Sequence, residues 1–338
     1  MIKTDEGKVI LESRPEIEFE NEGVLNPACI EKDGLIHMFY RAVRKGNFST
    51  IGYCQIKDNK VIYRADKPIL IPEYDYESKG IEDPRITFFE GKYYMFYTAY
   101  DGQSALVAYA TSLNLNTWEK HGVISSQMSY DRAEDIFRKN KLDKRYGLFE
   151  QWYRFFKGEK VKLWEKDAAL FPKRINGKMA MIHRVLPGIQ ICYFDKFTDL
   201  NNKYWEKYLA NLDDYIILDP QEKFENAYVG GGCVPIETEA GWLLIYHSVN
   251  ENIKEGKIYY ACATLLDKNN PQKIIGQLNH PLFSPKNDWE KRGVIDNVVF
   301  PTGAVVKNDI LSIYYGAADK RIGVKTVKLS ELLKELTL

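Results

Sequence analysis

A phrase that occurs five times along the chain constrains the fold more than any other feature. Each copy consists of an apolar strand, a turn with charged residues or glycine, and an aromatic strand, and the copies begin at Asn26, Glu82, Lys166, Gly232 and Phe300. The turns KDG, EGK, NGK, EAG and KND lie between runs of Val, Ile, Tyr and Phe, a pattern typical of short β-hairpins. The sequence therefore predicts a fold dominated by β-strands.

Further strand candidates lie between the copies, in STIGYCQI, SALVAYATS, IQICYFD and KIYYACATLLD. They bring each repeat to about four strands, the number in one blade of a β-propeller. We predict an all-β chain in which residues 1–338 form a single five-bladed propeller domain. A β-sandwich would space its strands similarly, but it would give no reason for five copies of one phrase.

Two segments depart from the strand pattern. The C-terminal LSELLKELTL has leucines at helical spacing and predicts a short helix. Residues 126–162, between the second and third copies, are charged and aromatic without strand alternation, and we interpret them as a helical insertion. Trp152, Tyr153, Phe155 and Phe156 would supply an apolar face for a lid or for the interface of a homo-oligomer. A helical pair that packs only on its own blade is the alternative.

Composition narrows the range of partners. The chain has 47 basic and 47 acidic residues, which removes the electrostatic signature of nucleic-acid and anionic-membrane binders. No stretch is apolar and long enough for a signal peptide or a membrane span, so a cytoplasmic location is expected. The five cysteines stand singly within mostly apolar runs, which indicates reduced core residues rather than a metal site.

Polar residues recur at the ends of the repeated strands. The innermost strands of a propeller surround one central channel, so these positions are expected to converge on a shared pocket. Asp83 in GIEDPRI is the strongest candidate for an acid, because it stands before a proline and two residues before Arg85. A surface ion pair in a turn is the alternative for this motif. The other polar positions are Asn26, Lys166, Asp167, Thr302, Arg41, Arg184, His247, Asp319 and glycines 230–232.

Three of these positions carry basic side chains in the third and fourth repeats. Lys166, Arg184 and His247 could hold an anion such as phosphate through charge-assisted hydrogen bonds. His183, next to Arg184, is interpreted as a satisfied core histidine. The chain lacks a phosphate-binding glycine loop that opens a helix, and it lacks the HExxH, CxxC and GxSxG motifs. Nucleotide, zinc and serine-hydrolase chemistry are therefore disfavoured.

The motifs together resemble glycoside hydrolase family 130, the mannoside phosphorylases. The matching phrases are NPA with YRA, GIEDPRI, KDAALFP with HR, GWLLIYHSV and YYGAAD, and they extend over nearly the whole chain. The resemblance implies a five-bladed propeller and an inverting phosphorolysis of a β-mannoside that yields α-D-mannose 1-phosphate. Inorganic phosphate would be the co-substrate, and no cofactor or metal would be needed.

The resemblance also assigns roles residue by residue. Asp83 is similar to the family's general acid, which acts through the 3-hydroxyl of the mannosyl unit. The positions similar to phosphate ligands are Lys166, Arg184, His247 and Tyr259, although the pair Tyr259 and Tyr260 leaves the register open. The positions similar to sugar-binding residues are Asn26, Arg41 and Asp319, and Arg85 is expected to hold Asp83 in place.

Three alternatives stay open on the sequence. Some family members are β-mannosidases in which glutamates replace the basic cluster, and the cluster present here favours phosphate over water as the nucleophile. A furanosidase of the related five-bladed type would carry a carboxylate in the first repeat, where this chain has Asn26. A carbohydrate-binding propeller without activity would leave Asp83 and the basic cluster without a role. The linkage, β-1,4 or β-1,2, and the acceptor sugar are not decided by the sequence.

Overall fold

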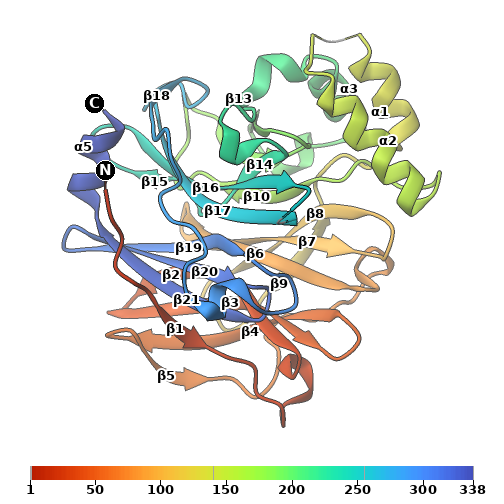
Figure 1. Cartoon of the computed structure of the whole chain (residues 1–338). Helices are drawn as coiled ribbons and strands as arrows, with labels where there is room; N and C mark the ends of the chain where they lie inside the picture. Colours follow the sequence, from red (N-terminus) through yellow and green to blue (C-terminus); the bar gives the residue numbers. More distant parts are fainter. Residues whose placement is uncertain (1, 140, 255, 338) are drawn as a thin grey trace.

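The computed structural model describes residues 2–139, 141–254 and 256–337, and these residues form a mainly β structure (Figure 1). Within them, the strands are arranged in four sheets, the largest of which has eight strands. That sheet consists of two antiparallel runs. In the described part of the chain, the two runs are joined only by the parallel bridge between Ser49 and Gly80. The first run contains β2 (Gly23–Lys32), β3 (Leu35–Arg44), β4 (Phe48–Lys57) and β5 (Lys60–Arg64), and the second contains β6 (Gly80–Phe89), β7 (Lys92–Tyr100), β8 (Ala105–Ser112) and β9 (Glu119–Val123).

The other three sheets are antiparallel and follow in chain order. They contain β10 (Lys166–Leu170), β11 (Met179–Arg184), β12 (Ile189–Phe194) and β13 (Ile216–Leu218); then β14 (Tyr228–Gly231), β15 (Ile236–Glu237), β16 (Trp242–Asn252), β17 (Gly256–Leu266) and β18 (Ile274–Gln277); then β19 (Val299–Lys307), β20 (Ile310–Ala317), β21 (Arg321–Lys328) and β1 (Lys8–Leu11). The N-terminal β1 pairs with β21, so the two ends of the chain close the last sheet together (Figure 1). The repeated strands predicted from the sequence are confirmed.

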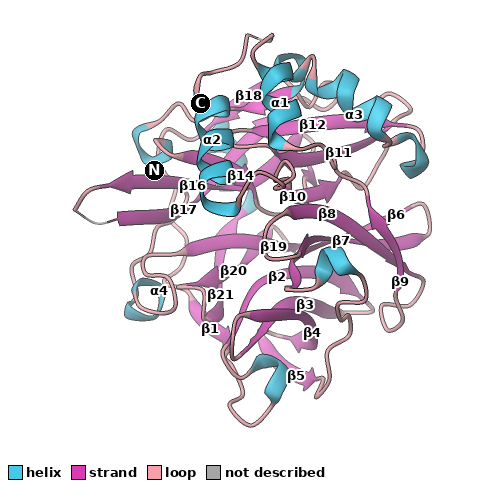
Figure 2. Ribbon diagram, turned by 90° about the vertical axis from the view of Figure 1, so that its right-hand side faces the viewer, coloured by secondary structure: helices cyan, strands magenta, loops and turns pink. Residues whose placement is uncertain are grey.

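The helices lie mainly at one end of the molecule (Figure 2). They are α1 (Tyr130–Phe137), α2 (Arg145–Lys157), α3 (Asn202–Leu209), α4 (Asp288–Lys291) and α5 (Leu329–Leu336). The predicted C-terminal helix is α5, and the predicted helical insertion contains α1 and α2. The helix α3 was not predicted, and its N-cap Asn201 accepts a hydrogen bond from the backbone N–H of Tyr204. None of the described helices is long and apolar enough to span a membrane.

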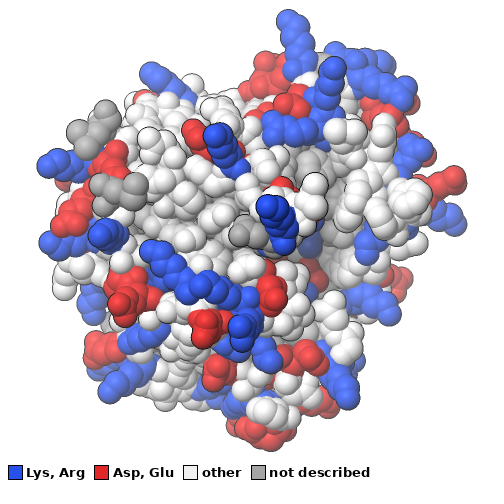
Figure 3. Space-filling model, in the orientation of Figure 1, with Lys and Arg blue, Asp and Glu red and all other residues white. Residues whose placement is uncertain are grey.

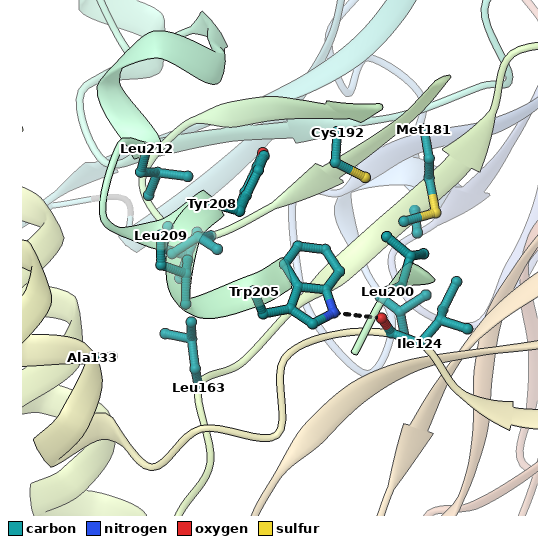
Figure 4. Close-up of a cluster of buried hydrophobic side chains, with 14 of the residues drawn as sticks. Ile124, Ala133, Leu163, Met181, Cys192, Leu200, Trp205, Tyr208, Leu209 and Leu212 are labelled. Carbon is teal, nitrogen blue, oxygen red and sulfur yellow. Dashed lines mark hydrogen bonds between the residues drawn. The ribbon is translucent and has the colours of Figure 1, made fainter. Parts of the chain in front are cut away.

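The inserted helices pack into a core that they share with strands of two neighbouring groups. Trp205 of α3 lies at the centre of this core and donates from its indole nitrogen to the carbonyl of Ile124 at 2.8 Å (Figure 4). Tyr153 of α2 is 8% exposed and belongs to the same core, together with Phe96 and Val107 from β7 and β8. The alternative that the helical pair packs only on its own strands is therefore wrong.

A buried glutamate is bonded to an aromatic side chain in each of the five antiparallel groups, and we call each such pair a latch. The glutamates are fully buried, and each lies shortly before the first strand of its group. The latch distances are 2.7 Å for Tyr40 and Glu20, 2.8 Å for Tyr97 and Glu77, 2.9 Å for His183 and Glu165, 2.7 Å for Tyr246 and Glu225, and 2.6 Å for Tyr315 and Glu290. Every latch thus ties the second strand of a group to the segment before its first strand.

The latches account for buried charged residues that were not predicted to have a role. His183 is the third member of the series and also contacts the hydroxyl of Tyr208 through Nε2 at 2.7 Å, and it is fully buried, as expected for a core histidine. Two latch carboxylates also pair with a basic residue on the fourth strand of the same antiparallel group: Glu77 with Lys120 at 2.6 Å, and Glu20 with Arg64 at 2.9 Å. A buried carboxylate with several partners is stable without its full hydration shell. All five cysteines are buried and unpaired, as predicted.

Candidate active site

Backbone bulges in the first strands aim polar side chains at one cavity. The strand register shifts between Leu25 and Ala28, between Glu82 and Arg85, and between Lys166 and Ala169. At these bulges Asn26, Asp83 and Asp167 take positive φ values of 48°, 52° and 57°. Asn and Asp are the residues other than glycine that most readily adopt this left-handed backbone, and bulges commonly redirect side chains beside functional sites. The sequence therefore has Asn and Asp at these positions for backbone as well as chemical reasons.

The cavity has a volume of about 210 Å³ and is lined by most of the predicted site residues. We call it the inner chamber. Seven of the nine predicted side chains line it, and they come from all five antiparallel groups: Asn26, Arg41, Asp83, Lys166, Arg184, Tyr259 and Asp319. Arg85 and His247 lie directly behind this lining and contact it. The predicted convergence of distant repeats on one pocket is thus found in the structure.

Asp83 lies among cations at the wall of the inner chamber. Its Oδ1 accepts a hydrogen bond from Asn26 Nδ2 at 2.8 Å and lies 3.5 Å from Arg41 Nη1. Burial by itself would raise the pKa of Asp83, but Arg41, Lys166 and Arg85 outweigh it, and the pKa lies below its ordinary value. Among these protein groups the carboxyl group is therefore ionised at neutral pH.

Asp319 faces the opposite electrostatic situation. Burial raises the pKa of Asp319 to about 6, with Arg41 opposing the shift and the nearby carboxylates of Asp83 and Glu82 adding to it. The chamber thus contains two carboxyl groups whose pKa values move apart, an arrangement common in sites that need an acid and a base.

Arg85 is a structural residue of the site. It is 1% exposed and donates to the carbonyls of Asp83 at 2.9 Å and Gly231 at 3.1 Å. A third bond goes to the carbonyl of Gly232, and its Nη2 lies 3.5 Å from Asp167 Oδ1. Arg85 therefore holds the backbone of the Asp83 bulge rather than the Asp83 carboxylate.

Arg184 forms the second cationic centre, and its partners were only partly predicted. Its Nη1 lies 3.0 Å from Asp167 Oδ2 and 3.2 Å from His247 Nε2. An arginine can only donate, so His247 accepts through Nε2. Burial, together with Arg184 and Arg85, lowers the pKa of His247 well below its ordinary value. The expectation that His247 is a third cation is therefore wrong, because a buried imidazole beside two guanidinium groups stays neutral.

Gly230 makes room for this cluster. A Cβ atom at this position would lie 2.6 Å from both Asp167 Oδ2 and His247 Nε2, so a larger residue would displace them. Gly230 lies in β14, whose first residue, Tyr228, lines the inner chamber. Close approach of side chains to the strand is the physical reason for glycine here.

The structure resolves the register of the two adjacent tyrosines. Tyr259 lines the inner chamber, and its hydroxyl lies 2.7 Å from the hydroxyl of Tyr228, whereas Tyr260 packs against the hydrophobic core. Burial raises the pKa of Tyr259, so its hydroxyl remains protonated and able to donate a hydrogen bond.

Glu82 was missed by the sequence analysis as a site residue, although it stands beside Asp83. It bridges two cations, accepting from Arg41 Nη2 at 2.9 Å and from Lys166 Nζ at 3.2 Å. Other lining residues that were not assigned to the site are Tyr153, Trp164, Tyr228, Val298 and Phe300. The aromatic members of this set gave a composition signal but no positional one, because aromatic residues occur throughout the strands.

A second, wider cavity of about 620 Å³ adjoins the inner chamber, and we call it the outer chamber. Four residues line both chambers, so the two chambers are parts of one site: Arg41, Lys166, Trp164 and Asp319.

Within the described residues, no group of three or more His, Cys, Asp or Glu side chains is arranged to hold a metal ion. On the face shown in Figure 3 the acidic and basic side chains are interspersed.

Comparison with known proteins decides the family. Residues 14–338 match the family model of glycoside hydrolase family 130, described as β-1,4-mannooligosaccharide phosphorylase. The chain belongs to this family of mannoside phosphorylases. The resemblance inferred from the sequence motifs is thereby confirmed, and so is the prediction that the chain is an enzyme of this class.

Two relatives from Thermoanaerobacter sp. match almost end to end. A 1,2-β-oligomannan phosphorylase is 35% identical over 336 residues, covering 96% of each chain, and a β-1,2-mannobiose phosphorylase is 35% identical over 338 residues, covering 95% of each chain. The structure of the β-1,2-mannobiose phosphorylase from Listeria innocua, solved with β-1,2-mannobiose, has a TM-score of 0.74 at 24% identity and covers 99% of both chains. The family 130 fold therefore extends over the whole described chain.

Proposed function

We propose that this enzyme cleaves a β-mannoside with inorganic phosphate, with inversion, and releases α-D-mannose 1-phosphate. The observation that carries the proposal is the inner chamber, where Asp83, Lys166 and Arg184 line one space formed by strands from all five groups. An anionic nucleophile needs no base on the protein, so one carboxylic acid and a cationic anion site are sufficient for the reaction.

The charges of the protein groups around the chamber suggest how Asp83 becomes protonated. Four cations of the site, Arg41, Arg85, Lys166 and Arg184, are matched by four carboxyl groups, Glu82, Asp83, Asp167 and Asp319. A phosphate anion that binds to Lys166 and Arg184 adds negative charge and weakens the effect of Lys166 on the pKa of Asp83. Binding therefore raises the pKa of Asp83 and favours uptake of the proton that a general acid must donate.

The catalytic steps follow from this arrangement. Arg184, Lys166 and the hydroxyl of Tyr259 hold phosphate, with His247 fixing Arg184 from behind. Asn26, Arg41 and Asp319 bind the mannosyl unit. Asp83 passes its proton through the 3-hydroxyl of that unit to the glycosidic oxygen, while phosphate forms the new bond at the anomeric carbon from the opposite face. The acceptor sugar leaves through the outer chamber.

We also propose that the five antiparallel groups are the five blades of one propeller domain, residues 1–338, with the insertion at 126–162. The support is that each group contacts the next in chain order and that β19 of the last group contacts β2 of the first. Five latches, one in each group, are a second and independent sign of the repeat. A cytoplasmic location stays a prediction.

The near full-length relatives favour the β-1,2 linkage over the β-1,4 linkage as the first substrate to test. The experiment is the reverse reaction: α-mannose 1-phosphate is incubated with mannose, β-1,2-mannobiose, glucose and N-acetylglucosamine, and released phosphate is measured. Release with an acceptor supports the phosphorylase and names its substrate. Absence of release, together with mannose liberated from β-mannosides in phosphate-free buffer, would replace the proposal by a β-mannosidase.

A further inference from the structure

We infer that the outer chamber binds the acceptor sugar and that Trp164 and Tyr100 form its stacking platform, held in place by the inserted helix α2. This inference rests on the proposed phosphorolysis and assigns the residues that select the acceptor. The other walls of the chamber include the carboxylates of Glu22 and Glu82, the side chain of Asn47 and the apolar pair Val294 and Ile295.

Trp164 stands where the two chambers meet, since it lines both of them. Its indole nitrogen donates to the carbonyl of Gln103 at 2.9 Å, so the polar edge of the ring is already bonded within the protein. Tyr100 lines the outer chamber, and its ring centroid lies 6.0 Å from that of Trp164 with the planes at 76°. Two aromatic rings at this angle form a corner.

A pyranose suits such a corner. One face of the sugar ring exposes C–H groups that pack on aromatic rings, and its rim carries hydroxyl groups that need hydrogen-bond partners. In the outer chamber the aromatic corner lies together with the polar groups of Arg41, Glu82 and Asp319, which can bond such hydroxyls. The mixture of apolar faces and polar rim groups is the chemistry of a neutral sugar.

The insertion fixes this platform. Tyr153 of α2 packs on Trp164 with ring centroids 4.3 Å apart and an interplanar angle of 31°. Lys157, the last residue of α2, donates to the hydroxyl of Tyr100 at 2.8 Å, and its Nζ lies 5.6 Å from the centroid of Trp164. One helix therefore supports both rings, and Lys157 is a positioning residue rather than a direct ligand.

The repeat shows that Trp164 has acquired a separate role. Each latch glutamate follows an aromatic residue, and the five residues are Phe19, Tyr76, Trp164, Phe224 and Trp289. Of these, Trp164 lines the two chambers, whereas the other four line neither. In the third group the insertion precedes Trp164, and its latch glutamate, Glu165, stands directly before the site residue Lys166. The connection between the latch glutamate and the first strand is therefore shorter in this group, and this places Trp164 at the pocket.

The test compares Trp164→Ala and Trp164→Phe with the control Phe155→Ala, which removes an aromatic side chain that is 83% exposed from the same insertion. In the synthesis direction, the KM for mannose and for β-1,2-mannobiose is expected to rise about tenfold in Trp164→Ala. The KM for α-mannose 1-phosphate stays within about twofold of wild type. Trp164→Phe retains most of the acceptor affinity, and the control matches wild type.

Lys157 gives a second and milder arm of the test. Lys157→Met should raise the acceptor KM with little change in kcat, and Lys157→Arg should restore it, because an arginine can still donate to the Tyr100 hydroxyl. A purely structural role would instead lower the thermal stability of both variants without this split between KM and kcat.

Several results would overturn the inference. An equal rise in the KM for α-mannose 1-phosphate, or a fall in kcat alone, would mean that Trp164 serves Lys166, whose Nζ lies 5.2 Å from its ring centroid. Calorimetric binding of β-1,2-mannobiose in phosphate-free buffer does not depend on turnover, and an unchanged Kd in Trp164→Ala would refute the platform. An inactive wild-type enzyme that still binds mannobiose through Trp164 would refute the proposed reaction alone.

Discussion

Replacement of Asp83 by asparagine tests the mechanism most directly. Asparagine keeps the size of the side chain, tolerates the φ of 52°, and can still accept the 2.8 Å bond from Asn26 through its amide oxygen. It cannot donate a proton as an acid. Since positioned general acids contribute about 10²- to 10⁴-fold to rate, we expect kcat to fall by at least about a hundredfold in the reverse reaction.

The binding of phosphate should respond in the other direction. Asp83 lies 3.5 Å from Arg41 and lowers the positive potential of the chamber. Without this negative charge, the KM for α-mannose 1-phosphate should stay equal or fall, while kcat falls.

The ionised carboxylate of Asp83 also stabilises the fold at neutral pH, because its pKa lies below the ordinary value. The variant should therefore lose about 1–3 kcal/mol of stability, which a thermal melt at pH 7 measures.

Asp33→Asn is the matched control for this experiment. Asp33 has a φ of 53°, close to that of Asp83, but it lies exposed in the turn between β2 and β3. Its replacement should leave kcat, KM and stability near wild type. Full activity of folded Asp83→Asn would refute the assignment of the acid. A rise in KM with unchanged kcat would refute it equally, because it would make Asp83 a binding residue only.

Three further predictions follow from charge and burial. Asp319→Asn should be more stable than wild type at pH 7.5 and should lose this advantage by pH 4. The pKa of Asp319 is raised from 3.8 to about 6, so its ionisation in the folded protein costs up to about 3 kcal/mol of stability above pH 6. Urea unfolding at both pH values measures this difference, and a difference that does not depend on pH would contradict the prediction. Tyr97→Phe should lower the free energy of unfolding by about 1–3 kcal/mol with kcat unchanged, because Glu77 loses a buried partner. A chelator should leave activity unchanged, and dependence on an added metal would refute the metal-free mechanism.

The hairpins of the fold could be predicted because each depends on residues that are close together in the sequence. Alternation and turn residues around Asp33 and Gly34 predict a hairpin, and the structure has β2 and β3 joined there. The helix α3 escaped prediction because its sequence, NKYWEKYL, is rich in aromatic residues that also suit strands.

Site residues could be predicted where the repeat gave them matched positions. Asn26, Asp83 and Arg184 stand at strand positions that the five phrases share, so their convergence follows from the fold. The neutral state of His247 could not be predicted, because it depends on burial and on Arg85, which is far away in the sequence. Trp164 was missed for a similar reason, since its role depends on the packing of the insertion.

The latches had a sequence signal that becomes visible only with the structure. An aromatic residue followed by glutamate precedes every repeat, as in Phe19 and Glu20 or Trp289 and Glu290. The same dipeptide occurs at Trp118 and Glu119 outside this series, so the pattern alone is not specific. What defines a latch is the buried tyrosine or histidine of the second strand, and that pairing spans a sequence distance that no local pattern shows.

The latches and the catalytic groups occupy adjacent positions in the chain, and this links stability to function. Tyr40, His183 and Tyr246 are latch residues, and each is followed directly by a site residue, Arg41, Arg184 or His247. A latch fixes its strand through a buried carboxylate, so the next side chain is held in position without a bond to the substrate. Such support from behind is what preorganises charged groups for catalysis. In the proposed mechanism, the glutamates of these three latches therefore act through geometry, whereas the carboxylates of the chamber act through their protons and charge.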